Sequence, residues 1–157
     1  MTTEEAKLWN EEISNSYALR AAEVMLKLAQ ARNSVINLSL AQDALISATD
    51  DKRTQIQILT GQILAYLDSI DAQRAIAAMA LNTSNASDVR ISAFNSLATS
   101  AKVNANKLPG EIIDSIYQLI SSLETEPKLR DAAAASYGAL NLPSQKVKDL
   151  ILDQAKS

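Results

Sequence analysis

The sequence predicts an all-α solenoid of about four antiparallel helical hairpins with a C-terminal capping helix, forming one domain over residues 1–157. Three observations lead to this prediction. The 157 residues include only three glycines and three prolines, which favours helices joined by short polar loops. Apolar residues recur at helical spacing along most of the chain. Arg53, Arg90 and Arg130 each stand near the start of such a segment, and their separations of 37 and 40 residues are typical of stacked helical repeats.

Each repeat unit is expected to hold a first helix, a polar turn and an arginine-bearing second helix. The first unit divides into "TEEAKLWNEEIS" and "YALRAAEVMLKLAQA", with a capping box between Thr2 and Glu5 and with Arg20 as a weaker copy of the repeated arginine. Together with the capping helix, the four units give nine helices. The expected units and cap are residues 3–31, 34–67, 71–103, 108–142 and 143–157.

The second and third units contain side chains that can cap the N-termini of their helices. The second unit pairs "SVINLSLAQDALIS" with "KRTQIQILTGQILAYL", and the third pairs "DAQRAIAAMALN" with "DVRISAFNSLATSAKV". Polar side chains precede several of these segments. The candidate caps are Asn33-Ser34, Thr49-Asp50-Asp51 and the stretch from Ser84 to Asp88.

The fourth unit, "PGEIIDSIYQLISSL" and "PKLRDAAAASYGAL", and the final helix, "PSQKVKDLILDQAKS", each begin at a proline, which fits the first turn of a helix. Ala93 and Ala133 both stand three residues after an arginine, and small side chains at this position allow neighbouring helices to approach closely. One side of the fourth unit's first helix is apolar. Its apolar residues are Ile112, Ile113, Ile116, Leu119, Ile120 and Leu123.

Aromatic residues make up 4% of the chain, which is low for a surface that stacks nucleic-acid bases. We therefore expect them in the core or between helices. The two terminal helices are expected to present polar outer faces, as the ends of a repeat array need. The aromatic residues in question are Trp9, Tyr17, Tyr66, Tyr117 and Tyr137, and the polar ones are Glu4, Glu5, Lys7, Glu11 and Glu12 at the start and Lys146, Lys148, Asp149 and Asp153 at the end.

The segments "SDVRISAFNSLA", "EPKLRDAAAASYGAL" and, less closely, "DDKRTQIQIL" resemble bacterial HEAT-like repeats of the PBS-lyase type. The resemblance covers residues 49–142. It implies a right-handed α-α superhelix that binds a protein or peptide on its concave face. The chain departs from the family pattern at Lys128, which stands where Asp51 and Asp88 precede their arginines in the other units, so a regular aspartate–arginine ladder is not expected.

The composition excludes several classes of function. The chain has no cysteine, hence no thiolate nucleophile and no zinc–thiolate site, and no histidine, hence no serine–histidine triad. Its net charge of −3 argues against binding to nucleic acid. No apolar stretch is long enough to cross a membrane, and the acidic start does not look like a secretory signal. We therefore expect a cytoplasmic protein that is not an enzyme, with no catalytic residue, cofactor or metal.

The repeated arginines allow two interpretations. On the concave side they could grip an acidic partner, or each could bond carbonyls or a turn carboxylate of the preceding unit. The fixed position of one arginine per hairpin favours the second interpretation. Exposed polar residues of the second helices are expected to contact the partner. The candidate partner-binding residues are Arg53, Gln57, Arg90, Asn95, Arg130 and Asp131.

The function predicted from these features is a non-enzymatic scaffold that binds a protein or peptide along the repeat array. Two alternatives stay open. One is an accessory or lyase-like component related to proteins with PBS-lyase-type repeats, some of which handle chromophores. The other is a self-assembly module of a larger protein. The sequence does not predict the oligomeric state.

Overall fold

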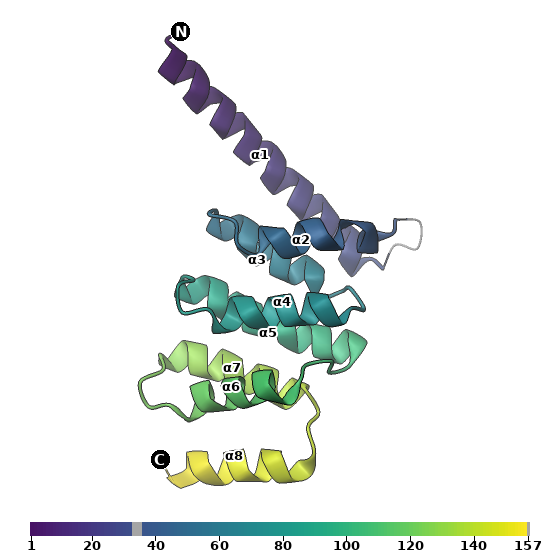
Figure 1. The fold of residues 1–157 in the computed structure, drawn as a ribbon, viewed down its shortest axis with the longest axis vertical. Helices are drawn as coiled ribbons and strands as arrows, with labels where there is room; N and C mark the ends of the chain where they lie inside the picture. Colours follow the sequence, from purple (N-terminus) through teal and green to yellow (C-terminus); the bar gives the residue numbers. More distant parts are fainter. Residues whose placement is uncertain (33–35, 157) are drawn as a thin grey trace.

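The computed structural model describes residues 1–32 and 36–156, without the side chains of residues 144–147, and this part of the chain is helical with no strand (Figure 1). The all-α prediction is confirmed. Asn33 and Ser34, expected as caps, and the side chain of Lys146 lie outside the described part. The elements are α1 (Thr3–Gln30), the 3-10 helix η1 (Leu38–Ala41), α2 (Gln42–Ala48), α3 (Thr54–Leu64), α4 (Ile70–Leu81), α5 (Ser87–Asn104), α6 (Gly110–Ser121), α7 (Pro127–Ala139) and α8 (Ser144–Lys156).

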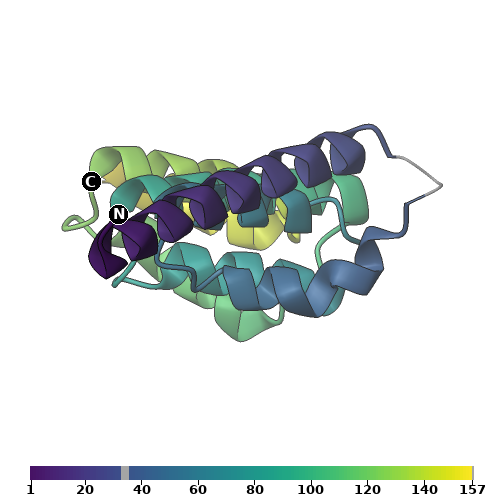
Figure 2. The same cartoon turned by 90° about the horizontal axis from the view of Figure 1, so that it is seen from above.

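The helices pack in two rows that run along the long axis of the molecule (Figures 1 and 2). Helices α1, α3, α5 and α7 contact one another in that order and form the odd row. Helices α2, α4, α6 and α8 likewise form the even row. Each of the pairs α2/α3, α4/α5 and α6/α7 is a hairpin that joins the two rows. Within each of these three hairpins, helices that are consecutive in the sequence also pack on each other.

The first unit is one helix and not the two that the sequence analysis expects. Helix α1 runs without interruption over 28 residues from a capping box in which Glu5 N–H donates to Thr2 Oγ1 at 3.1 Å. The expected break falls in the polar segment Ser14–Ser16, which holds no glycine or proline. Serine and asparagine cost only about 0.5 kcal/mol each in a helix, less than the loss of several backbone hydrogen bonds at a break. The described chain thus has eight α-helices and η1.

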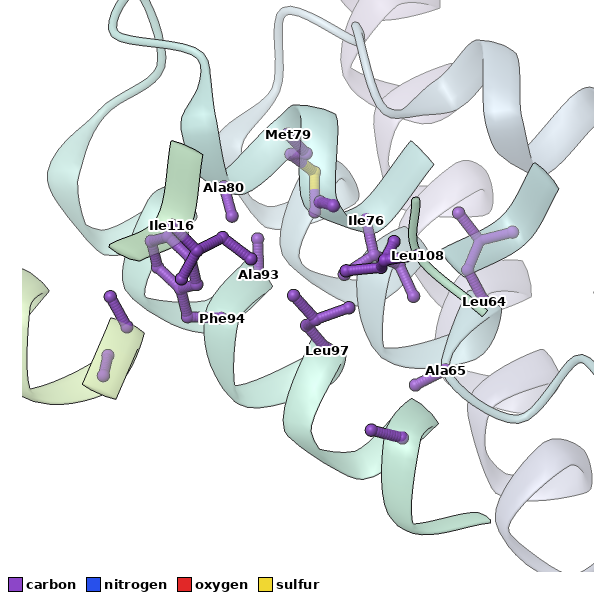
Figure 3. Close-up of a cluster of buried hydrophobic side chains, with 14 of the residues drawn as sticks. Leu64, Ala65, Ile76, Met79, Ala80, Ala93, Phe94, Leu97, Leu108 and Ile116 are labelled. Atoms are coloured by element: carbon purple, nitrogen blue, oxygen red, sulfur yellow. The ribbon is translucent and has the colours of Figure 1, made fainter. Parts of the chain in front are cut away.

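The core lies between the two rows and is built mainly from aliphatic residues, together with Met79, Phe94 and Tyr137. Figure 3 shows part of it around Phe94 and Leu97. Burying a side chain of this size stabilises the fold by about 1.5–3 kcal/mol. Ala93 in α5 and Ala133 in α7 are fully buried, as expected for residues at a close contact between helices. The large, fully buried aliphatic residues include Ile63, Leu64, Ile76, Leu97 and Ile116.

Two of the aromatic residues do not take their expected place. Tyr137 is buried, with its ring centroid 6.1 Å from that of Tyr117. By contrast, Trp9 and Tyr17 in α1 are 59% and 69% exposed. The reason is that the N-terminal half of α1 extends beyond the neighbouring helix α3 (Figure 1), so nearly all side chains of residues 3–17 stay exposed. The polar residues predicted for the outer face of the first helix, Glu4, Glu5, Lys7, Glu11 and Glu12, are exposed as expected, but Trp9 and Tyr17 are exposed beside them.

The fully buried side chain of Gln73 fixes the loop between α5 and α6. Its Nε2 donates to Ser100 Oγ and to the carbonyl of Ala105, both at 3.0 Å, and its Oε1 accepts from the N–H of Lys107 at 2.6 Å. Ala105 has φ 63° and ψ 170°, a region that favours glycine. The three hydrogen bonds of Gln73 help to hold this strained turn in place.

The turn between α4 and α5 recurs forty residues later between α6 and α7. Asn85 Nδ2 donates to the carbonyl of Met79 at 2.9 Å, and the hydroxyl of Thr125 donates to that of Leu119 at 2.8 Å. Each side chain thus caps the end of the first helix of its hairpin, six residues back in the sequence. The two turns therefore share a side-chain-to-carbonyl hydrogen bond at positions forty residues apart.

Candidate functional site

Arg53 ties α3 to its own turn and to α1. Its Nε and Nη2 donate to the two carboxylate oxygens of Asp51 at 2.8 and 2.7 Å, and its Nη1 donates to Asn15 Oδ1 at 2.9 Å. The hydrogen bond from the guanidinium lowers the pKa of Asp51 from 3.8 to about 2. The guanidinium thus already holds two protein partners in the structure.

Arg90 and Arg130 bond backbone carbonyls of their own hairpins. Arg90 Nε donates to the carbonyl of Ala80 at 2.9 Å, and burial lowers the pKa of its guanidinium. Arg130 Nη2 donates to the carbonyls of Ser122, Leu123 and Thr125 at 3.0 to 3.2 Å. A cation near the C-terminus of a helix is favoured by the helix dipole and by the free carbonyls there.

The expectation that these arginines bond the preceding unit is therefore wrong for Arg90 and Arg130, whose bonds remain within one hairpin. Arg53 bonds Asp51 within its own hairpin and also bonds Asn15 in α1, which belongs to the preceding unit. As expected, a regular aspartate–arginine ladder is absent from the described residues. The Asp88 carboxylate accepts from the N–H of Val89 at 2.8 Å, whereas Asp51 pairs with its arginine.

Gln57, expected as an exposed contact residue, is only 8% exposed. Its Nε2 donates to the carbonyl of Thr49 at 2.9 Å and to Asn85 Oδ1 at 3.4 Å. The side chain thus links the turn before α3 to the turn before α5. The prediction of an exposed side chain is wrong here, and we leave Gln57 out of the candidate site.

A groove of about 390 Å³ lies on the surface of the odd row, mainly between α3 and α5. Asn95 is exposed in this groove, as the sequence analysis expects of a contact residue. The lining combines amide and hydroxyl groups with the partly buried side chains of Tyr66 and Ile91. The lining residues are Gln30, Gln62, Ala65, Tyr66, Asp88, Ile91, Ser92, Asn95, Ser96 and Thr99.

Asp131 is also exposed, and it occupies in α7 the position that Ile91 occupies forty residues earlier in α5. Asn95 and Asp131 therefore belong to the same side of the odd row. The three arginines are half-buried and lie where the second helices of the hairpins begin. Arg53 immediately precedes α3, and Arg90 and Arg130 lie near the starts of α5 and α7.

Several groove residues were missed by the sequence analysis, although helical spacing could have found some of them. Ser92 and Thr99 stand three residues before and four residues after Asn95, so they lie on the same face of α5. Gln62 and Tyr66 come from α3 and the residues after it. These two side chains lie near α5 because α3 packs on α5, and a local sequence pattern does not predict that packing.

The described side chains include no group of three or more acidic residues, histidines or cysteines close enough to hold a metal ion. Over the same described part of the chain, no helix is both long and apolar enough to cross a membrane.

Comparisons of the sequence with protein-family models and curated proteins, and of the fold with solved structures, found no match.

Proposed function

We propose that this chain is a single-domain, right-handed α-solenoid of HEAT-like repeats and that it acts as a non-enzymatic scaffold for a protein or peptide. The contacts α1–α3–α5–α7 and α2–α4–α6–α8 support a solenoid, because each helix packs on the next one of its own row. The turns that recur at a separation of forty residues support a repeat origin. The assignment to HEAT-like repeats rests on the resemblance of the segments "SDVRISAFNSLA", "EPKLRDAAAASYGAL" and "DDKRTQIQIL" to such repeats.

The observation that carries the proposed function is the groove between α3 and α5. Its amide and hydroxyl groups, among them those of Gln62, Asn95 and Thr99, can donate to and accept from the backbone of an extended segment. Tyr66 and Ile91 offer apolar contact for a side chain of that segment. Asp88 places a negative charge in the groove, which favours a neutral or basic segment over an acidic one.

The arginines do not form part of the proposed contact surface. Arg90 and Arg130 use guanidinium donors on backbone carbonyls, and Arg53 uses its own on Asp51 and Asn15. Of the six residues predicted from the sequence, Asn95 and Asp131 remain as contact candidates.

The proposal is tested by selecting peptides that bind the purified chain from a random library and then measuring their affinity for two variants. Asn95→Lys places a long cation in the groove, and Gln118→Lys places the same cation on the exposed face of α6 in the even row. We expect Asn95→Lys to weaken binding at least ~10-fold and Gln118→Lys to leave it unchanged. Equal affinity for both variants, or failure to select any peptide, would contradict the proposal.

A further inference from the structure

The aspartate that stands two residues before the arginine has different partners in two successive units. Before α3, Asp51 accepts from Nε and Nη2 of Arg53 with both of its carboxylate oxygens. Asp88 occupies the same position before Arg90, but Arg90 Nε donates to the carbonyl of Ala80 instead. Among the described residues, Asp88 forms no ion pair. Its charge is therefore not neutralised within its own unit.

Asp88 is exposed and lines the groove between α3 and α5. Of the ten residues that line this groove, it is the one that is charged at pH 7, since the others are amides, hydroxyls and apolar side chains. Arg90 is not among them. A single carboxylate in a neutral groove favours a cation at one defined place.

Helices α3 and α5 run in the same direction, and their ends lie level. Gln57 in the first half of α3 bonds Asn85 in the turn before α5. Asn104, the last residue of α5, donates from Nδ2 to the carbonyls of Ala65 and Leu67, just after α3, at 3.1 Å each. The groove therefore has one end at which both helices begin and another at which both helices end.

Asp88 lies at the first of these ends and Tyr66 at the second. Asp88 is the second residue of α5, whereas Tyr66 comes two residues after the end of α3. Thr99 lines the groove eleven residues after Asp88, which at 1.5 Å per residue places the two about 16 Å apart along α5. An extended chain advances about 3.3 Å per residue, so about five residues span this length.

The end of the groove at Tyr66 is less suited to a cation. Lys102 is exposed three residues after Thr99, and Lys27 is exposed three residues before Gln30, so each lies on the same side of its helix as a groove residue. Gln30 is the last residue of α1, and the ends of α1 and α3 share a neighbouring cavity of about 470 Å³. These two lysines repel a cation there, so it is favoured at the other end.

We propose that the groove binds an extended basic segment, with a lysine or arginine paired to Asp88 and an apolar side chain about four to six residues away on Tyr66. This inference rests on the proposed function and names the class of segment that is bound. An exposed ion pair adds little affinity, so Asp88 acts mainly on specificity. Between the two ends, Asn95 and the other amide and hydroxyl groups bond the backbone of the segment.

The experiment uses peptides selected from a random library on the full chain. We expect a lysine or arginine in these peptides, about four to six positions from an aromatic or aliphatic residue. One such peptide is then compared with a version in which glutamate replaces the basic residue. Asp88→Lys should bind the basic peptide about 5-fold more weakly than the unmodified chain does, and should bind the glutamate version more tightly.

Two further variants separate the charge from effects on folding. Asp88→Asn keeps the shape of the side chain and an oxygen that can accept from the N–H of Val89, and it should reduce the preference for the basic peptide. Asp71→Lys is the matched control, because Asp71 is exposed and is the second residue of α4, as Asp88 is of α5. Both changes remove an acid from the first turn of a helix, but Asp71 lies in the even row, so peptide affinity should be unchanged. Circular dichroism checks that each variant is folded.

Selected peptides without a basic residue, or with acidic residues in its place, would overturn this inference. So would a preference for the basic peptide that Asp88→Lys leaves unchanged. In either case the proposed function would stand if Asn95→Lys still weakens binding. Failure to select any peptide would overturn both.

Discussion

Replacing Arg130 with methionine tests whether the repeated arginines hold the turns together. The substitution keeps an unbranched apolar stem and removes the guanidinium, whose Nη2 donates to three carbonyls in the turn between α6 and α7. The functional alternative is that this guanidinium binds a partner. The two alternatives predict opposite results for stability and for affinity.

The size of the effect follows from the contacts. A hydrogen bond to a charged donor contributes about 1.5–3 kcal/mol net, but the three carbonyls share one nitrogen, so we count them as about one such bond. The favourable charge at the C-terminus of α6 adds about 0.3–1 kcal/mol. Arg130 Nε, however, is buried with no hydrogen-bond partner in the described structure, which costs stability. Because methionine lacks this atom, the substitution recovers part of the stability lost with the hydrogen bonds. We expect a net destabilisation of about 1–2 kcal/mol.

The assay is urea unfolding followed by circular dichroism, with Lys128→Met as the matched control. Lys128 is an exposed cation two residues earlier in the same helix, and its replacement should change the stability by less than about 0.5 kcal/mol. Peptide affinity of the folded Arg130→Met variant should be unchanged. Unchanged stability combined with lost affinity would refute the structural role.

Three further predictions concern packing, strain and pH. Ala133→Leu should destabilise the fold by about 1–3 kcal/mol in the same urea assay, because it overfills the contact between α5 and α7, whereas the exposed Asp131→Ala should stay within about 0.5 kcal/mol. Ala105→Gly should stabilise the fold by up to about 1 kcal/mol, since glycine adopts φ 63° without strain; a lower thermal midpoint would contradict this. The folded pKa of Asp51, about 2, lies below the ordinary value of 3.8, so its pairing stabilises the fold above about pH 4 and this contribution is lost as the pH falls toward 2. The stability difference between the unmodified chain and Asp51→Asn should disappear over that window, and a difference that persists at pH 2 would exclude the pairing as its cause.

Local patterns predicted most helices because caps, prolines and apolar spacing all act within a few residues. Pro109 is the N-cap of α6 and Pro127 lies in the first turn of α7, as expected. The polar residues Ser14–Ser16 are the exception: their weak helix propensity predicts a turn, but no glycine or proline is present there to break the helix, and α1 continues through them.

The candidate site depended more on packing than on local pattern. Asn95 was predicted correctly as exposed because it lies on the outer side of an amphipathic helix. Gln57 was not, because its burial requires two turns to meet, and their approach is set by how α3 packs on α5. The exposure of Trp9 depends in turn on the length of α1, which the predicted break had shortened.

The ordered row α1–α3–α5–α7 is tested most directly by a distance between its two ends. The chain has no cysteine, so spin labels can be placed at Arg20→Cys in α1 and Asp131→Cys in α7, both exposed. Packed helices lie about 8–10 Å apart, so three successive spacings place the two axes roughly 24–30 Å apart. Pulsed electron paramagnetic resonance should therefore give a distance well above that between adjacent helices. A distance below roughly 15 Å, as adjacent helices of a closed bundle would give, would contradict the row.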